Sequence, residues 1–135
     1  MGRLLVFLEK CEHLKDSDGI GKSDPYVKFE LKKDKLVFDR SFGKMESSKK
    51  HGDCNPVYNE TFTFNSVDSL NKMDLNITVM DDDIGMDDKI GEAHIDLDHA
   101  LLNATPKDMI LVVDKKRFKV FAKEATIHLK LSYEE

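Results

Sequence analysis

Five aspartates fall within the eight residues from 81 to 88, and this density constrains the chain more than any other feature. Adjacent carboxylates repel one another, so a stretch of this kind needs a positive partner. The apolar residues that lead into it alternate with polar ones, as in a half-buried strand: Leu75, Ile77 and Val79. If the strand persists, Asp81 and Asp83 continue the same parity and point to one side. Paired carboxylates at a strand end suit Ca²⁺.

A second acidic loop precedes this one in the chain. Residues 14–25 contain three aspartates, two glycines and one proline, a composition typical of a loop. Both acidic loops follow predicted strands, and in a β-sandwich two such loops can lie at the same end. Solvation explains a single acidic loop, but two loops that pool their carboxylates favour a shared cation site.

The rest of the chain predicts one all-β domain over residues 1–135. Alternating patterns indicate strands at 3–11, 26–31, 60–64, 74–80, 90–97 and 126–133. Residues 109–113 and 117–122 are interpreted as a strand pair joined at 114–116, and 98–103 as a short helix with Asp98 as its N-cap. Residues 36–38 and 44–50 are weaker strand candidates. Many short strands separated by turns favour an antiparallel β-sandwich.

Composition excludes several classes of function. Cys11 and Cys54 lie far apart and match no metal spacing, which favours reduced thiols in a cytosolic protein. No apolar run approaches the roughly 20 residues of a membrane helix, so any membrane contact is expected to be peripheral. A formal net charge of −5 without tryptophan argues against nucleic-acid binding. No nucleophile, zinc or phosphate-loop motif of an enzyme occurs.

An EF-hand is the nearest alternative for the acidic stretch. Asp81, Asp83 and Glu92 match positions 1, 3 and 12 of its loop. Position 6 is Met86, where the EF-hand turn requires glycine, and the flanking residues are typical of strands. This alternative is therefore rejected.

Three segments, in order, resemble motifs of C2 domains. Residues 18–28 (DGIGKSDPYVK) resemble the first calcium-binding loop, 55–62 (NPVYNETF) a second motif, and 81–91 the third loop with its D-x-D and D-x-x-G elements. The resemblance implies an eight-stranded antiparallel C2-type sandwich with calcium-binding loops at one end. The last strand resembles the one that other C2 domains place first, which suggests the permuted, type II topology.

The resemblance also implies a ligand set for Ca²⁺. The carboxylates are expected from five aspartates: Asp18, Asp24, Asp81, Asp83 and Asp88. Backbone carbonyls of Ser17 and Asp82 are further ligands, and Asp87 is an alternative one because the span from Asp83 to Asp88 is one residue shorter than in many members. Two ions are expected, with one or three as alternatives. Tyr58 replaces the usual tryptophan of the second motif, which we interpret as packing.

The function expected from these features is calcium-dependent binding to anionic phospholipid. Bound Ca²⁺ would complete its coordination with lipid head groups while three apolar loop residues insert: Ile20, Ile84 and Met86. The alternative for these residues is that they fold back against the domain. A monomeric cytoplasmic protein, recruited to membranes peripherally and open to protein partners, fits this expectation.

A lysine-rich region suggests a basic face. Its candidate head-group residues are Lys28, Lys32, Lys33, Lys44, Lys49 and Lys50. In C2 domains a similar face can bind phosphoinositides, but a solvated face that keeps a strand from aggregating explains the lysines equally well. The alternative function is therefore a calcium-independent adaptor of C2 fold that binds proteins or phosphoinositides.

Overall fold

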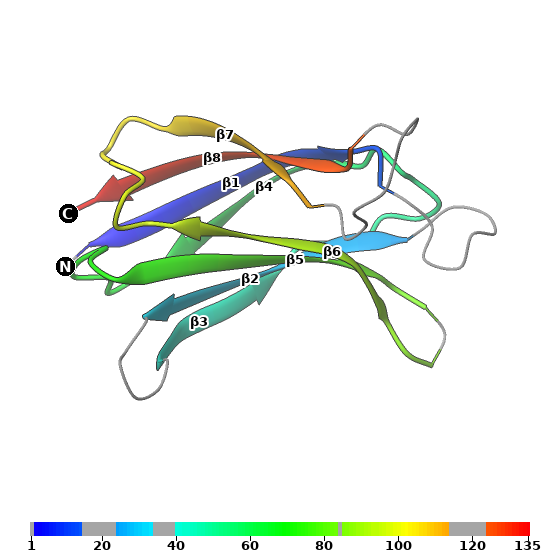
Figure 1. Cartoon of the computed structure of the whole chain (residues 1–135), viewed down its shortest axis with the longest axis horizontal. Coiled ribbons are helices and arrows are strands. Elements are labelled where there is room, and N and C mark those ends of the chain that lie inside the picture. The colour runs from blue at the N-terminus through cyan, green and yellow to red at the C-terminus, as the bar shows by residue number, and fades with distance from the viewer. Residues whose placement is uncertain (1, 15–23, 34–39, 84, 114–123) are drawn as a thin grey trace.

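In the computed structural model, the described part of the chain forms eight β-strands (Figure 1). The structure describes residues 2–14, 24–33, 40–83, 85–113 and 124–135. In chain order the strands are β1 (Arg3–Glu12), β2 (Pro25–Lys33), β3 (Arg40–Glu46), β4 (Val57–Phe64), β5 (Met73–Asp81), β6 (Asp88–Asp96), β7 (Lys107–Val112) and β8 (Thr126–Glu134).

The strands form two four-stranded antiparallel sheets, which confirms the predicted sandwich. One sheet has the order β4-β1-β8-β7 and the other β3-β2-β5-β6. The C-terminal strand β8 lies between β1 and β7.

Alternating apolar side chains from both sheets fill the space between them. On β5, for example, Leu75, Ile77 and Val79 are fully buried while the residues between them are partly exposed. Phe29 of β2 and Phe62 of β4 join the two sheets, with ring centroids 5.0 Å apart at an interplanar angle of 45°. Such offset aromatic pairs add stability beyond the apolar area that they bury.

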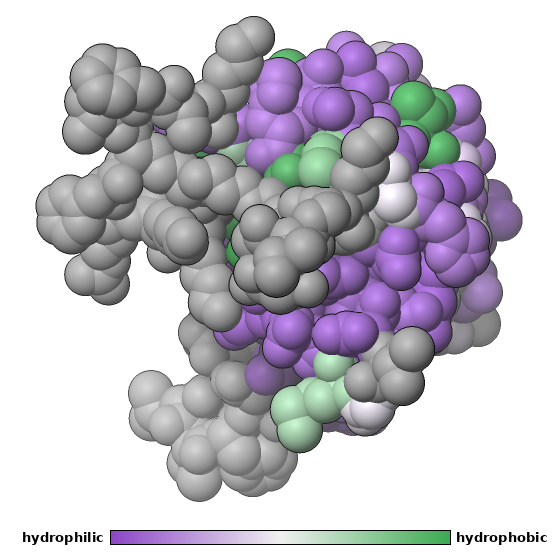
Figure 2. Space-filling view, turned by 90° about the vertical axis from the view of Figure 1, so that its right-hand side faces the viewer, coloured by the Kyte–Doolittle hydropathy of each residue, from purple (hydrophilic) through white to green (hydrophobic). Residues whose placement is uncertain are grey.

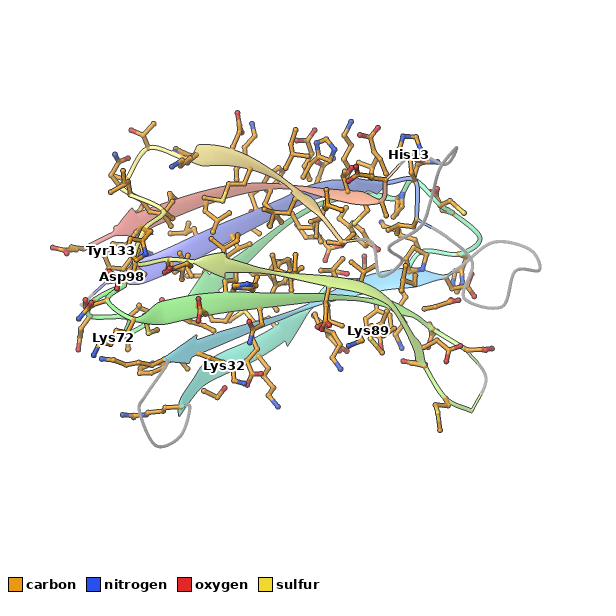
Figure 3. All side chains as sticks on the ribbon, in the orientation of Figure 1. His13, Lys32, Lys72, Lys89, Asp98 and Tyr133 are labelled. Atoms are coloured by element: carbon orange, nitrogen blue, oxygen red, sulfur yellow. The ribbon has the colours of Figure 1, made fainter. Side chains whose placement is uncertain are left out.

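The two ends of the sandwich differ in what they carry. Figure 1 shows the connection from β5 to β6 at one end and both chain termini at the other. Figure 3 places Lys72, Asp98 and Tyr133 at the end with the termini, and His13 at the opposite end. We refer to the end that carries the β5–β6 connection as the loop end.

The prediction of a short helix over 98–103 is wrong, because these residues form turns and irregular structure. Asp98 does not cap a helix, since its Oδ2 accepts a hydrogen bond from the distant backbone N–H of Lys72 at 3.0 Å. Leu101 has a left-handed backbone with φ of 57°, which an α-helix does not permit. The carbonyl of Asn103 then accepts a hydrogen bond from the N–H of Tyr133 instead of a helical partner.

The predicted strand pair at 109–122 is described only in its first half. Strand β7 pairs with β8 throughout its length, from Lys107 opposite Leu131 to Val112 opposite Thr126. Residues 117–122 and the weak candidate at 36–38 lie outside the described residues. The other weak candidate, 44–50, is strand only as far as Glu46.

Candidate metal centre

Three strands place acidic residues beside one another at the loop end. In the sheet register Asp81 of β5 lies opposite Pro25 of β2 on one side and opposite Asp88 of β6 on the other. Asp24 immediately precedes Pro25 and is therefore next to Asp81. Directly opposed residues of antiparallel strands have Cα atoms about 4.5–5.5 Å apart. The register thus brings residues from two distant acidic segments to one place.

Asp81 occupies the core-facing side of β5 at its last position. Its side chain continues the parity of Val79, and the residue is 9% exposed. Strand β5 ends here, so Asp83 does not continue the pleat and lies in an exposed position. A buried carboxylate at a strand end needs compensating donors or a cation because burial disfavours its charged form.

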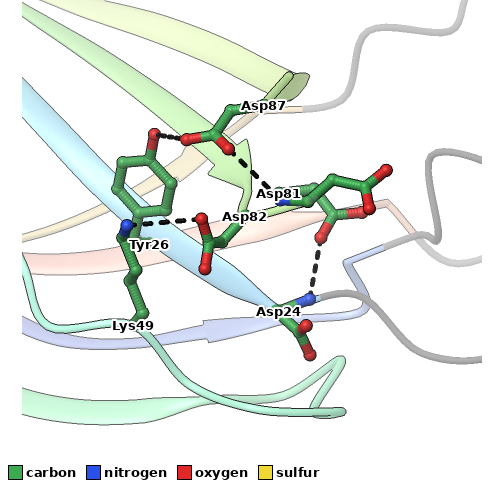
Figure 4. A network of polar contacts seen from close by, with 7 residues as sticks. Asp24, Tyr26, Lys49, Asp81, Asp82 and Asp87 are labelled. Atoms are coloured by element: carbon green, nitrogen blue, oxygen red, sulfur yellow. Dashed lines mark hydrogen bonds and ion pairs between the residues drawn. The ribbon is translucent and has the colours of Figure 1, made fainter. Parts of the chain in front are cut away.

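Asp24 connects the two acidic loops through its backbone and side chain (Figure 4). Its N–H donates to Asp81 Oδ1 at 2.9 Å, and its carbonyl accepts from the N–H of Asp82 at 2.9 Å. The Asp24 Oδ1 atom accepts from the N–H of Gly52 at 2.7 Å. Gly52 has φ of 57°, a conformation that glycine adopts without strain, so the turn at 51–54 can point this N–H at the carboxylate.

Asp87 is held by two donors at the base of the acidic turn. The hydroxyl of Tyr26 donates a hydrogen bond to Asp87 Oδ2, and the N–H of Asp83 donates to Asp87 Oδ1 at 3.2 Å. The bond from Tyr26 contributes most to lowering the pKa of Asp87 below its usual range, followed by the bond from Asp83. Burial and then the bond to Asp87 raise the pKa of Tyr26. Asp87 is therefore ionised at neutral pH, although it already has protein partners.

A lysine approaches the same carboxylates from another part of the chain. Lys49 Nζ lies 3.3 Å from Asp82 Oδ1 and 5.1 Å from the centroid of the Tyr26 ring (Figure 4). The sequence assigned Lys49 to a basic sheet face together with Lys28 and Lys44. In the structure Lys49 lies beyond the end of β3, where its ammonium group contacts Asp82 and the Tyr26 ring.

The tip of the β5–β6 turn is open to solvent. Gly85 has φ of 98°, which a residue with a side chain rarely adopts, and Met86 next to it is 77% exposed. Asp83 and Asp88 are exposed as well. Ile84 and the candidates from the first loop, Ser17, Asp18 and Ile20, lie outside the described residues.

The described donors fit Ca²⁺ in chemistry, since carboxylates and carbonyls are the hard oxygen ligands that it prefers. Asp24, Asp81 and Asp88 occupy neighbouring positions at adjacent strand ends, and Asp82 and Asp83 follow Asp81 in the chain. Within the described ranges, no group of three or more His, Cys, Asp or Glu side chains is close enough to hold a metal. The predicted ligands Ser17 and Asp18 lie outside the described residues, so only some of the predicted ligand set can be placed.

Tyr58, interpreted from the sequence as a packing residue, also has a polar role. Its ring is buried at 6% exposure, and its hydroxyl donates to the carbonyl of Pro25 at 2.8 Å. The N–H of Lys50 donates to the same carbonyl at 3.0 Å. Tyr58 thus fixes the residue that follows Asp24 and stabilises the start of β2.

The remaining predicted basic residues lie on the outer face of the β3-β2-β5-β6 sheet or near its edges. Lys28 and Lys44 line a hollow on this face together with three glutamates: Glu30, Glu46 and Glu92. Lys44 Nζ is 3.9 Å from Glu30 Oε2. On β2 the side chain of Lys33 points to the opposite side of the sheet from those of Lys28 and Lys32. The Nζ atom of Lys50 lies 5.4 Å from the centroid of the Tyr58 ring. The structure therefore does not gather the six lysines on one face.

The surface at the loop end is mainly polar where the residues are described. Figure 2 views the molecule from this end and shows hydrophilic side chains over most of the coloured surface, with a few apolar patches. None of the described segments is a helix long and apolar enough to cross a membrane.

A family model described as "C2 domain" matches residues 2–113. The chain belongs to the C2 domain family. Among known proteins, this C2 domain is 38% identical over 96 residues to synaptotagmin-9 of Rattus norvegicus, which covers 70% of the chain and 19% of that protein. It is 36% identical over 99 residues to human synaptotagmin-10, covering 72% of the chain and 18% of that protein. The chain thus spans about a fifth of the length of these curated relatives.

Solved structures share the same fold. A C2 domain of plant extended synaptotagmin 1 superposes with a TM-score of 0.78 at 25% identity, covering 98% of this chain and 94% of that one. A human GIVD cytosolic phospholipase A2 structure gives a TM-score of 0.75 at 20% identity, covering 99% of this chain and 17% of that one. At 20% identity, the comparison with the phospholipase A2 structure shows only that the two chains share the sandwich fold.

Sequence reasoning missed three contributors to the site: Tyr26, Lys49 and the backbone N–H of Gly52. Tyr26 belongs to the DPYVK segment that was recognised, but only its partner Asp87 reveals its role. Lys49 and Gly52 lie in the segment after β3 with no clear alternation, so no sequence pattern placed them beside the aspartates. The backbone bonds of Ser47 to Val27 and of Lys50 to Pro25 bring this segment to the site.

Proposed function

We propose that this C2 domain is a calcium-dependent module that binds anionic phospholipid membranes through its loop end. The observation that carries the proposal is the direct link between the two acidic segments, in which the Asp24 N–H donates to Asp81 Oδ1 and its carbonyl accepts from the Asp82 N–H. Residues far apart in sequence are thereby held at one place. The similarity to synaptotagmin C2 domains supports the same proposal.

The proposed ligands are the carboxylates of Asp18, Asp24, Asp81, Asp83 and Asp88, with carbonyls of Ser17 and Asp82 and with Asp87 as an alternative. Bound Ca²⁺ supplies positive charge and open coordination positions that a lipid phosphate or carboxylate can fill. The binding of two ions changes the formal charge from −5 to −1, and the change falls at the loop end. Before binding, the aspartates repel an anionic surface; afterwards this repulsion is removed.

Apolar side chains at the turn provide the second part of membrane affinity. Met86 is 77% exposed at the tip of the β5–β6 turn, and this exposure supports its proposed role as an inserting residue. Burial of one large apolar side chain contributes roughly 1.5–3 kcal/mol. Together with Ile20 and Ile84, Met86 would give reversible anchoring, which a calcium switch requires.

The test is sedimentation with vesicles of phosphatidylcholine, with and without phosphatidylserine, in Ca²⁺ or in chelator. We expect binding only with phosphatidylserine and Ca²⁺, and its loss in the variant that combines Asp81→Asn and Asp83→Asn. Asparagine keeps a side-chain oxygen at position 81, so the hydrogen bond from the Asp24 N–H can persist while the charge is removed. The loss of binding is therefore attributable to the charges of the site.

A matched control changes the same number of charges elsewhere. The variant with Asp68→Asn and Asp108→Asn alters two exposed aspartates, and the ion pair of Asp108 with Lys130 at 3.8 Å contributes little to stability. This control should sediment as the unaltered protein does. Vesicle binding that persists in chelator, or that the site variant leaves intact, would contradict the proposal.

The alternative is a calcium-independent adaptor that uses the lysine-bearing sheet face. The hollow on this face carries Lys28 and Lys44 but also three glutamates, so its formal charge does not favour a multiply charged phosphoinositide. Binding to phosphoinositide vesicles in chelator, abolished by Lys28→Ala with Lys44→Ala, would favour this alternative over the calcium switch.

A further inference from the structure

One positive charge of the chain already lies among the acidic residues of the loop end. Lys49 Nζ is 3.3 Å from Asp82 Oδ1, and both side chains are partly shielded, with 44% and 33% of their surfaces exposed. Asp82 lies between Asp81 and Asp83, two of the carboxylates assigned to Ca²⁺. The ammonium group of Lys49 therefore lies next to the proposed position of Ca²⁺.

The position of Lys49 is fixed by its surroundings. The N–H groups of Ser47 and Lys50, on both sides of it, donate to the carbonyls of Val27 and Pro25 on β2 at 2.8 and 3.0 Å. Its Nζ also lies 5.1 Å from the centroid of the Tyr26 ring, within the range of a cation–π interaction. Tyr26 in turn donates to Asp87, so Lys49 is part of the network that organises the acidic turn.

We propose that Lys49 is an internal counter-ion of the calcium loops, which stabilises the ion-free domain and raises the Ca²⁺ concentration needed to fill the site. This inference rests on the proposed calcium site and adds a residue that sets its affinity. Like charges disfavour each other at short range, so an ammonium group beside Asp82 reduces the attraction of the site for Ca²⁺. Loss of that ammonium group removes the repulsion.

The neighbouring lysine offers a matched control. Lys50 carries the same charge one residue later, but its Nζ lies 5.4 Å from the centroid of the Tyr58 ring. Its substitution changes the net charge by the same amount. The contrast between Lys49→Met and Lys50→Met therefore separates the contact with Asp82 from a general change in charge.

The experiment is calorimetric titration of Ca²⁺ into the unaltered domain and the two variants without lipid. Lys49→Met should lower the dissociation constant for Ca²⁺ about three- to tenfold. A change of this size is expected when the repulsion between a partly shielded ammonium group and a divalent ion is removed. Lys50→Met should change it less than about twofold, because screening weakens more distant charges. Lys49→Arg should restore the affinity of the unaltered domain.

A second comparison tests whether Asp82 mediates the effect. In a domain that carries Asp82→Asn, Lys49→Met should change the dissociation constant less than it does alone, because Asp82 no longer holds the ammonium group beside the site. The backbone carbonyl of residue 82 is unaffected by this substitution. Equal effects of Lys49→Met with and without Asp82→Asn would overturn the role of the contact.

Thermal unfolding in chelator gives a readout that requires no ion. Lys49→Met should unfold at a lower temperature than Lys50→Met, since it leaves the aspartates without their counter-ion, and saturating Ca²⁺ should reduce this difference. If the unaltered domain binds Ca²⁺ but Lys49→Met and Lys50→Met have equal affinities, only this inference fails. If the unaltered domain gives no calcium-binding heat, the proposed function fails with it.

Discussion

At the scale of single residues, Asp96 and His99 form an exposed pair whose charge depends on pH. His99 Nδ1 lies 2.7 Å from Asp96 Oδ2. The hydrogen bond and the negative charge of Asp96 raise the pKa of His99 above 6.5, and the same bond lowers the pKa of Asp96 below 3.8. Both groups are therefore charged between the lowered pKa of Asp96 and the raised pKa of His99.

The sign of the pH dependence follows from these directions. The contribution of His99 to stability is full below its unfolded pKa of 6.5 and is lost as pH rises through the folded value. The contribution of Asp96 is present above 3.8 and is lost as pH falls through its folded value. An NMR titration should give a pKa above 6.5 for His99, and Asp96→Asn should lower it. An unchanged pKa in Asp96→Asn would contradict the pairing.

Two residues of the site illustrate what the sequence could predict. The alternation of Leu75, Ile77 and Val79 predicted that Asp81 continues their parity, and its burial agrees. The position of Lys49 could not be predicted, because it depends on where β3 ends and on backbone bonds to β2. A side chain that follows a regular strand obeys the pleat, whereas one in an irregular connection depends on tertiary contacts.

At the scale of elements, β6 approaches the backbone just after β7 so closely that one position admits no side chain. A Cβ atom added to Gly91 would lie 1.5 Å from the carbonyl oxygen of Val113. The N–H of Val113 donates to the carbonyl of Ala125 at 2.9 Å, so this backbone is not free to move away. Gly91→Ala should therefore destabilise the domain by about 3 kcal/mol, at the upper end of overpacking costs.

Chemical denaturation measures this destabilisation, with Glu92→Ala as the control on the same strand. Glu92 is exposed, and its ion pair with Lys89 at 3.1 Å is a surface pair of small value. Equal stability of Gly91→Ala and Glu92→Ala would contradict the close approach of β6 and Val113.

The same distinction between local pattern and tertiary contact explains why the helix predicted at 98–103 does not form. An aspartate before a short apolar run is a common N-cap pattern. In the folded chain Asp98 instead accepts from the N–H of Lys72, and Asn103 accepts from the N–H of Tyr133. The strands were predictable because their alternation spans several residues, but six residues give a helix too little local stability to compete with such bonds.

At the scale of the whole molecule, the β5–β6 acidic turn and the termini lie at opposite ends (Figure 1). If the loop end contacts the membrane, the end with Tyr133 and Asp98 faces away from it (Figure 3). Two exposed apolar residues mark the two ends: Met86 at 77% exposure in the β5–β6 turn, and Leu101 at 82% in a hollow shared with Tyr133 and Glu135. Met86 and Leu101 are similarly exposed but lie at opposite ends of the domain.

This pair allows a test of orientation. An environment-sensitive fluorophore attached through Met86→Cys should shift to shorter wavelength when Ca²⁺ and phosphatidylserine vesicles are added together, because the tip enters an apolar phase. The same fluorophore at Leu101→Cys should not shift. Cys54 is partly exposed and is therefore first replaced by serine. Cys11 can stay, because its burial raises the pKa of its thiol to about 12 and leaves it unreactive. A shift at both positions would indicate non-specific adsorption, and a shift at Leu101→Cys alone would reverse the proposed orientation.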